Sequence, residues 1–383
     1  MAIRRSLRRA LPPHGGSGDE EVPAAGRPSP DAGPSADAGL PADAGLPPAD
    51  AGPLAEGGPL ADPDGPAVPT GPERDPAAPP EERSKPASWE FEAGAEIAPG
   101  RTVVRTLGGG RRFEVHLVWD EHLFALAVAK LLRPGQASDE RALRELREEA
   151  EVLERLAHPV LVRRFDAVLD GPHPHVLIEH LEGPPLRRLI RRHGALPNEQ
   201  LLPLAAHVAA ALHYMAAEGV VHLDVKPDNI VMGVPPRLID LSVARSLERA
   251  ARMSSPIGTD AYMPPEQCDP ASHPGEAGPA SDVWGLGATL YHAVAGEVPF
   301  PRPKGARESE DPRVRFPQLE EGPRPLPHGT PPTLVELLGR MLAKRPEKRP
   351  AAGEVVLDLE PLVAALPRKL AFGRRGTRTR SRS

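Results

Sequence analysis

The sequence predicts an α+β protein with two lobes, a small β-rich lobe with one long helix and a larger, mainly helical lobe. Between residues 101 and 133, apolar and β-branched residues alternate with polar ones around a glycine turn, which is typical of short paired strands. After residue 198, apolar residues recur every three or four positions, which is typical of helices. Strands that come first and helices that come later favour separate layers over an alternating βαβ order.

Composition sets residues 1–88 apart from the rest of the 383-residue chain. This segment holds 19 prolines, 12 glycines and no aromatic residue, and the triplet Asp-Ala-Gly recurs in it. Large apolar side chains are too scarce there to offset the entropy of ordering. We therefore expect an acidic disordered tail, either a plain solvated segment or a docking platform for partners. Residues 367–383 are rich in arginine and predict a second, basic disordered tail.

The folded region is expected over residues 89–366, with the first lobe at about 89–181 and the second at about 182–366. Beyond residue 88 the chain carries 39 basic and 39 acidic residues, so a nucleic-acid partner is not expected. Cys268 is the single cysteine, which excludes a disulfide framework and a Cys-based zinc site and predicts a packing residue rather than a redox site. No window approaches about 18 uninterrupted apolar residues, so no transmembrane segment is predicted and we expect a cytoplasmic protein.

The elements follow from local patterns in chain order. The strands over residues 101–133 surround a glycine triplet at 108–110. Residues 138–157 predict an amphipathic helix with Ser138 as its N-cap. The remaining predicted elements are strands at 175–181, 230–232 and 237–239, and helices at 198–218, 281–295, 333–343 and 353–365.

A stretch after residue 218 carries the side chains that phosphoryl transfer needs. Residues 222–229 read HLDVKPDN, and Asp240 follows eleven residues after Asn229. Phosphoryl transfer uses one carboxylate to accept a hydroxyl proton, and an amide oxygen with a second carboxylate to hold Mg²⁺. Lys130 ends an apolar strand and can supply a cation for the phosphates, and Glu149 on the amphipathic helix can pair with it. Taken alone, such a lysine is a solvated strand end and the glycine triplet is a hairpin turn.

Together these motifs resemble the eukaryotic-like (Hanks-type) Ser/Thr protein kinases of bacteria over about residues 100–366. The resemblance implies the two-lobed protein-kinase-like fold, ATP with Mg²⁺ or Mn²⁺ as cofactors, and proteins as substrates. The matching segments, in chain order, are LGGGRRFEV at 107–115, AVAK at 127–130, REEA at 147–150, HLDVKPDN at 222–229, GTDAYMPPE at 258–266, SDVWGLG at 281–287 and RPEKRP at 345–350.

The resemblance implies a role for each charged residue of the second lobe. Asp224 would orient the substrate hydroxyl and accept its proton, and Lys226 would neutralise the γ-phosphate. Asn229 and Asp240 would hold the metal. Positioning and electrostatics are then sufficient for the chemistry, without a covalent intermediate.

The resemblance also implies a nucleotide site in the first lobe. Lys130, held by Glu149, would grip the α- and β-phosphates, and Ile178 would be the gatekeeper beside adenine. Valine side chains would sandwich the adenine ring, and two backbone groups after the gatekeeper would meet its edge. The residues expected around the nucleotide are Leu107, Gly108, Gly110, Val115, Val128, Glu179, Leu181 and Val231.

Three departures from the family pattern concern the nucleotide and metal sites. Phe113 replaces the third glycine of the loop, so we expect a looser phosphate clamp. Val128 replaces an alanine and adds bulk next to adenine. Ser242 replaces the glycine two residues after Asp240, so we expect this segment to flip less readily into an inactive orientation.

Leu223 replaces the arginine that usually precedes the catalytic aspartate. That arginine receives an activation-loop phosphate through charge-assisted hydrogen bonds, which leucine cannot make. We therefore expect activity that does not require phosphorylation of Ser254, Ser255 or Thr259. Simple packing beneath the loop is the alternative interpretation of Leu223.

The residues favour an ATP-dependent phosphotransferase that moves the γ-phosphate to Ser/Thr hydroxyls of proteins, because every charged catalytic residue is present. The alternative is a pseudokinase that binds nucleotide weakly or not at all and acts as a scaffold, which the altered glycine loop, Leu223 and Ser242 favour. A phosphotransferase for small molecules is a third interpretation. Residues 258–266, which resemble a peptide-docking segment, argue against it.

Overall fold

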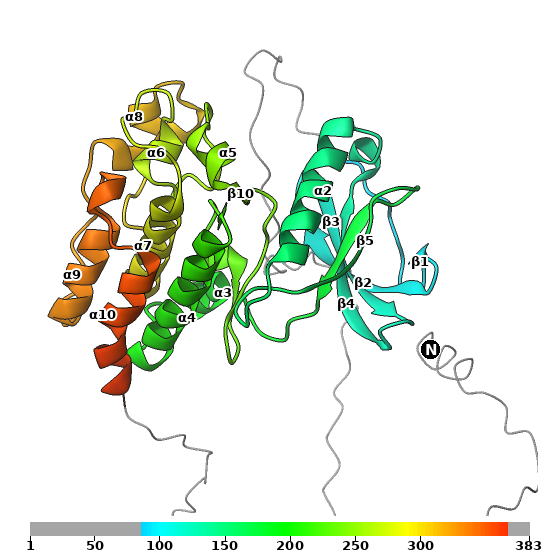
Figure 1. Ribbon diagram of the computed structural model, residues 1–383, viewed down its shortest axis with the longest axis horizontal. Helices are drawn as coiled ribbons and strands as arrows, with labels where there is room; N and C mark the ends of the chain where they lie inside the picture. The colour runs from blue at the N-terminus through cyan, green and yellow to red at the C-terminus, as the bar shows by residue number, and fades with distance from the viewer. Residues whose placement is uncertain (1–85, 367–383) are drawn as a thin grey trace, which may run out of the picture. The chain divides into compact units, whose positions relative to one another are not determined.

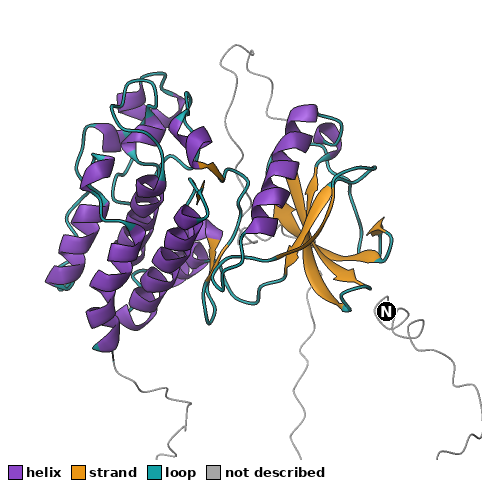
Figure 2. Ribbon diagram, in the orientation of Figure 1, coloured by secondary structure: helices purple, strands orange, loops and turns teal. Residues whose placement is uncertain are grey.

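The computed structural model describes residues 86–366. The predicted basic tail and residues 1–85 of the predicted acidic tail lie outside the described residues. Figure 1 shows a sheet lobe that includes helix α2 (Glu140–Arg155) and a second lobe made mainly of helices, and Figure 2 shows the long strands gathered in the first lobe. The predicted α+β class with two segregated lobes is confirmed. Within residues 86–366, no helix combines the length and the apolar character needed to cross a membrane.

The first lobe is built on one six-stranded sheet in the order β1-β2-β3-β4-β6-β5. Each strand runs antiparallel to its neighbours. The predicted strands over 101–133 correspond to β2, β3 and β4, whereas β5 was not predicted because its sequence RFDAV, at the sheet edge, has little apolar alternation. The strands are β1 (Glu96–Ala98), β2 (Arg101–Gly109), β3 (Phe113–Asp120), β4 (Ala125–Leu132), β5 (Arg164–Val168) and β6 (His175–Glu179).

Strand β4 lies inside the sheet and carries Lys130. Its last six residues are buried, because both faces of the strand are covered. In the register, Val115 of β3 lies opposite Lys130, and Val128 lies opposite Ile178 of β6. Since alternate residues of a strand point to the same side, Val128 and Lys130 share one face. The residues predicted for adenine and for phosphate therefore lie on the same face of the sheet.

Helix α2 packs its apolar stripe against the sheet. Its buried residues follow three- and four-residue steps, as predicted, and include Leu146 and Glu149. The predicted N-cap was wrong: the backbone N–H of Ala142 donates to Oδ1 of Asp139 at 2.8 Å, so Asp139 caps the helix instead of Ser138. A carboxylate is favoured at this place because it both accepts the hydrogen bond and complements the positive end of the helix dipole.

The second lobe packs its helices around α4 and α7. Two short strand pairs, β7 (Val220–Val221) with β10 (Arg245–Ser246) and β8 (Ile230–Val231) with β9 (Arg237–Leu238), frame the loops between them. The helices are α3 (Leu186–His193), α4 (Asn198–Ala217), α5 (Leu247–Ala251), α6 (Pro265–Cys268), α7 (Pro279–Ala295), α8 (Pro312–Arg315), α9 (Pro332–Met341) and α10 (Ala352–Ala364), with 3₁₀ turns η2 (Pro227–Asn229), η3 (Ala306–Glu308), η4 (Pro317–Leu319) and η5 (Pro346–Lys348). The remaining 3₁₀ turn, η1 (Pro134–Gln136), lies in the first lobe between β4 and α2.

Helix α7 is buried along most of its length and supports the loop that follows β7. Asp282 accepts hydrogen bonds from the backbone N–H groups of His222 and Leu223, both at 2.7 Å. One turn further, a Cβ on Gly285 would lie 3.1 Å from both Cβ and the carbonyl oxygen of Val225. Glycine therefore permits the close approach by which α7 fixes the loop.

A buried ion pair ties α6 to the segment before α10. Arg349 donates from Nη1 and Nη2 to the two carboxylate oxygens of Glu266 at 2.6 and 2.9 Å, and both side chains are fully buried. Ser281 also donates to Glu266 at 2.7 Å, and the Arg349 guanidinium lies over the ring of Trp284 at 4.9 Å. The pair therefore joins the segment at 258–266 to the helical core.

We predict that Arg349→Met lowers the free energy of unfolding by about 3–5 kcal/mol, because it leaves the Glu266 carboxylate buried and unpaired. Urea unfolding of the purified protein measures this. The matched control is Arg340→Met, which breaks an exposed pair with Asp358 whose side chains are 44% and 39% exposed. The control is expected to cost less than about 1 kcal/mol. Similar small losses in both variants would contradict the prediction.

Candidate active site

Lys130 lies where three elements meet. Its Nζ donates to Oε1 and Oε2 of Glu149 at 2.7 and 2.9 Å, and to Oδ1 of Asp240 at 2.9 Å. Lys130 comes from β4, Glu149 from α2, and Asp240 from the loop after β9. All three side chains are buried. The structure thus brings the predicted Lys130–Glu149 pair together and adds a contact that links the first lobe to the second.

Burial raises the pKa of a carboxyl group, and the nearby ammonium of Lys130 lowers it. Both effects act on Glu149 and on Asp240, with different net results. Burial raises the pKa of Glu149, and the attraction of Lys130 offsets this only in part. Burial also acts to raise the pKa of Asp240, but the attraction of Lys130 outweighs it, so the pKa is lowered. Asp240 is therefore held as a carboxylate, which is the form that binds a metal ion.

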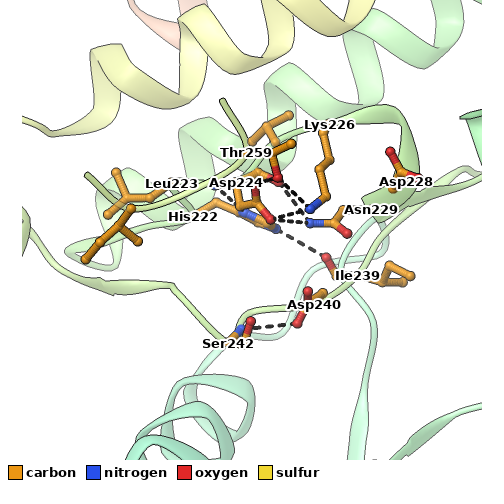
Figure 3. A network of polar contacts seen from close by, with 12 residues as sticks. His222, Leu223, Asp224, Lys226, Asp228, Asn229, Ile239, Asp240, Ser242 and Thr259 are labelled. Carbon is orange, nitrogen blue, oxygen red and sulfur yellow. Dashed lines mark hydrogen bonds and ion pairs between the residues drawn. The ribbon is translucent and has the colours of Figure 1, made fainter. Parts of the chain in front are cut away.

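The second cluster surrounds Asp224, as Figure 3 shows. Its Oδ1 accepts a hydrogen bond from Oγ1 of Thr259 at 2.8 Å, and its Oδ2 lies 2.8 Å from Nζ of Lys226. Lys226 Nζ also donates to Thr259 Oγ1 at 2.7 Å. Nδ2 of Asn229 donates to the backbone oxygen and to Oδ2 of Asp224 at 2.9 and 3.2 Å. Four residues predicted from one motif and one later segment therefore form a single network.

The amide of Asn229 presents an acceptor that the described residues leave unused. Its Nδ2 is bonded to Asp224, whereas its Oδ1 is buried and has no hydrogen-bond partner among residues 86–366. An unsatisfied buried acceptor costs about 1–3 kcal/mol, so this oxygen is suited to a ligand. Mg²⁺ prefers oxygen ligands and takes few of them from protein when phosphates supply the others. Asn229 and Asp240 therefore fit a divalent cation.

Two residues in the site adopt backbone conformations that cost energy. Leu223 and Asp240 both have φ of 63°, in the left-handed region that non-glycine residues rarely adopt. The conformation of Leu223 is held from both sides, because its N–H donates to Asp282 at 2.7 Å and its carbonyl accepts from Nε2 of Gln267 at 2.9 Å. Asp240 is held by Lys130. These contacts hold the two strained turns that carry the site's aspartates.

The residues expected around the nucleotide lie on the sheet and at the start of the second lobe. The side chain of Glu179 ion-pairs with Arg163 at 3.3 Å and with Arg237 at 3.2 Å, and its backbone N–H donates to the carbonyl of Arg163 at 2.9 Å. Through Glu179, the end of β6 is therefore linked to Arg163 in the first lobe and to Arg237 in the second. The elements supply these residues as follows: Leu107 and Gly108 from β2, Gly110 from the turn after it, Val115 from β3, Val128 from β4, Ile178 and Glu179 from β6, Leu181 just after it, and Val231 from β8.

Phe113 is packed inside the lobe. The side chain is 4% exposed and belongs to the same apolar cluster as Leu132 and Leu146. Its ring centroid lies 4.6 Å from Nζ of Lys130, a cation–π contact. The looser phosphate clamp expected at this position stays a prediction. What the structure adds is that the bulky residue fastens the turn between β2 and β3 to the core.

Leu223 also packs into an apolar cluster. It is 3% exposed and contacts a group formed by Val221, Val243, Ala250 and Ala277, with Met253 and Ile257 beside it. Leu223 therefore packs beneath the loop, and activity without phosphorylation stays a prediction. An exposed ion pair of 2.8 Å between Arg249 of α5 and Glu148 of α2 adds a second link from this segment to the first lobe. The apolar cluster and this ion pair therefore both hold the segment after β10.

Cys268 is a packing residue, as predicted. It is 1% exposed, and Nε2 of Gln318 donates to its Sγ at 3.3 Å. Burial raises the pKa of its thiol well above the ordinary value, so the reactive thiolate is disfavoured.

The fold and the two charged clusters are those of a protein kinase. A family model described as "Protein kinase domain" matches residues 101–358, which is more than half of the chain, and the chain belongs to this family.

The chain is similar to serine/threonine-protein kinases of bacteria. Serine/threonine-protein kinase PknB of Mycobacterium leprae is 31% identical over 267 residues, covering 66% of this chain and 41% of the relative. Serine/threonine-protein kinase PkaA of Streptomyces coelicolor is 34% identical over 237 residues, which cover 60% of this chain and 42% of the relative. The probable serine/threonine-protein kinase PkwA of Thermomonospora curvata is 33% identical over 266 residues, which cover 69% of this chain and 34% of the relative. The chain spans less than half the length of these curated relatives. The predicted resemblance to bacterial Hanks-type kinases is confirmed.

Sequence reasoning missed two contacts that hold the site. It placed Thr259 in the GTDAYMPPE segment and among the possible phosphorylation sites, and did not identify it as the direct donor to Asp224. It also missed Gln267, whose Nε2 bridges the carbonyls of Leu223 and Ile257 at 2.9 and 2.6 Å. The only signal for Thr259 was its place in the GTDAYMPPE segment, because no local pattern indicates a contact between residues 35 positions apart.

We predict that Thr259→Val raises the pKa of Asp224. Burial already raises this pKa, while the Lys226 ammonium and the Thr259 hydroxyl act to lower it. Removing the hydroxyl takes away one lowering contact, so the carboxyl must protonate at higher pH. Carbon-detected NMR titration of labelled aspartates measures the shift, and Thr259→Ser, which keeps the hydroxyl, is the control. A pKa that stays the same or falls in Thr259→Val would contradict the prediction.

Proposed function

We propose that the protein transfers the γ-phosphate of ATP to Ser/Thr hydroxyls of proteins. The observation that carries the proposal is the position of the Thr259 hydroxyl, which lies 2.8 Å from a carboxylate oxygen of Asp224 and 2.7 Å from the ammonium of Lys226. An acceptor hydroxyl needs the same two partners, a carboxylate for its proton and a cation for the phosphoryl group. The site is therefore built to hold a hydroxyl at the place of reaction.

The proposed reaction forms one P–O bond, breaks another and moves one proton. Asp224 orients the substrate hydroxyl and accepts its proton as the oxygen attacks the γ-phosphorus, while the bond to the β–γ bridging oxygen breaks and ADP leaves. Lys226 neutralises charge on the transferred group, and Lys130 on the phosphates that leave with ADP. When bound, Mg²⁺ or Mn²⁺ supplies further neutralisation of the phosphates, and Asn229 and Asp240 are the residues that would hold it. Glu149 positions Lys130 and touches no substrate.

The adenine would lie between Val115 and Val128 of the first lobe and Val231 of the second, with Ile178 behind it. Because the N–H of Glu179 already donates to a carbonyl within the protein, we assign its carbonyl to the edge of the ring. Leu107, Gly108, Gly110 and the backbone of Leu181 complete the proposed nucleotide site. Protein substrates, docking through the tails and a cytoplasmic location remain predictions.

A pseudokinase scaffold is the second candidate, and Phe113 is the observation that favours it. The ring covers Lys130 at 4.6 Å, on the ammonium that would meet the phosphates. Against it stands the Lys130–Glu149 pair, which is formed with both hydrogen bonds below 3.0 Å. A scaffold has no need for that pair together with the network around Asp224.

Transfer of labelled γ-phosphate tests the proposal directly. We predict that the purified protein with Mg²⁺ or Mn²⁺ labels itself or a protein acceptor, and that Asp224→Asn reduces the rate by roughly 10³-fold or more. The matched control is Asp228→Asn in the same loop, whose carboxylate is one-third exposed and lies 3.7 Å from Arg187. Equal labelling by the parent protein and Asp224→Asn would overturn the proposal, and nucleotide binding without transfer would favour the scaffold.

We also predict that activity survives removal of phosphate from the activation segment. Phosphatase treatment, or the double change Ser254→Ala and Ser255→Ala, should leave the initial rate within about twofold, because the apolar cluster around Leu223 replaces a phosphate–arginine link. Thr259 is left unchanged because it contacts Asp224. Intact-protein mass spectrometry confirms the phosphorylation state before each assay. A loss of tenfold or more on phosphatase treatment would contradict the prediction.

A further inference from the structure

A cavity of about 420 Å³ opens in the second lobe directly beside the proposed acceptor position. Its lining begins at Asp260 and Ala261, the two residues after Thr259, whose hydroxyl contacts Asp224. The other lining residues lie between 298 and 318, in the segment that runs from the end of α7 to η4. A peptide whose hydroxyl meets Asp224 can therefore reach this cavity within a few residues of the acceptor.

The lining carries more positive than negative charge. Two carboxylates, Asp260 and Glu308, face four cations, which are Arg302, Lys304, Arg307 and Arg315. Arg302 and Arg315 both contact the single carboxylate of Asp260, the second at 3.3 Å. Their side chains remain 28% and 21% exposed, so both are partly accessible from solvent. The cavity therefore keeps a local surplus of positive charge.

The base of the cavity is well packed. Gln318 is 1% exposed, and its Nε2 donates to the carbonyls of Asp260 and Met263 at 2.7 and 3.0 Å. Phe300 is 2% exposed and stacks on Trp284 with ring centroids 5.4 Å apart. Well-packed residues therefore lie beneath the charged side chains of the cavity. Such packing lowers the conformational entropy that is lost when a ligand binds.

We propose that this cavity binds an anionic side chain of the protein substrate close to the phosphorylated residue. The inference rests on the proposed function and adds a substrate class to it. Arginine pairs hold carboxylates and phosphates through two parallel hydrogen bonds, and a lysine adds a point charge. A glutamate or aspartate of the substrate and a phosphorylated residue share this chemistry, and the experiment separates them.

Peptides with one serine acceptor in a neutral host sequence test the proposal. One series carries a single glutamate at each position around the serine, a second carries phosphothreonine there, and a third carries glutamine as the uncharged reference. We expect the glutamate peptide to have a KM about tenfold below that of the glutamine peptide at one or two neighbouring positions. A preference shown by the phosphothreonine series alone supports the same site with phosphate as its ligand.

The variants Arg302→Gln and Lys304→Gln should remove this preference while the KM of the glutamine peptide stays unchanged. The matched control is Arg313→Gln, on the same short helix as Arg315, because Arg313 is 75% exposed and pairs with Glu320 instead. If no position shows a preference in either charged series, or if the control loses the preference as fully as the other two variants, the proposal is overturned.

Fluorescence anisotropy with labelled peptides separates this proposal from the proposed function, because it requires no transfer. Binding of the anionic peptide that weakens in Arg302→Gln supports the cavity even where no phosphate is transferred, and that result would count against the kinase reaction alone. Transfer to all peptides without any charge preference in KM or in anisotropy leaves the kinase reaction in place and overturns the cavity's role.

Discussion

The position of one ammonium group sets the geometry of the whole site. Lys130 is buried and shared between the carboxylates of Glu149 and Asp240, so the sheet, helix α2 and the loop after β9 must all meet at one point. Removing the ammonium would leave two buried carboxylates uncompensated, which is costly. Electrostatics therefore couples the two lobes at the place where a triphosphate is expected to bind.

The second constraint is a rigid base beneath the catalytic loop. Asp282 of α7 holds two consecutive backbone N–H groups, and Gly285 lets the helix come close enough to do so. The left-handed conformation of Leu223 persists because its N–H and its carbonyl are both held, and its side chain is sealed in an apolar cluster. Apolar packing of Leu223 thus holds the loop at the position where the family usually has an arginine.

Much of this could be predicted from the sequence, because local patterns carry local structure. The order of strands and helices, the pair formed by Lys130 and Glu149, and the inventory around Asp224 all follow from spacing and residue type. The N-cap was placed one residue too early, at Ser138, since serine and aspartate satisfy the same pattern and only the helix geometry selects Asp139.

Contacts between distant segments could not be predicted in the same way. The hydrogen bond from Thr259 to Asp224 depends on how two loops pack against α7. No repeating pattern in the sequence predicts such a contact. The cavity beside Asp260 likewise gathers residues from separated stretches, so its charge is visible only in three dimensions. The burial of Phe113 was missed for a related reason, because the glycine pattern suggests an open turn and only the packing against α2 fills it.

That buried ring has a kinetic consequence for the turn between β2 and β3. Lifting the turn away from the lobe would expose the aromatic side chain of Phe113, which is otherwise 4% accessible. Exposing such a side chain costs about 1.5–3 kcal/mol, which corresponds to a slowing of roughly ten- to a hundredfold. For a nucleotide bound at the proposed site beneath this turn, exchange of ADP for ATP would then be governed by the opening of the turn, and the occupancy of the site would lag behind changes in nucleotide concentration.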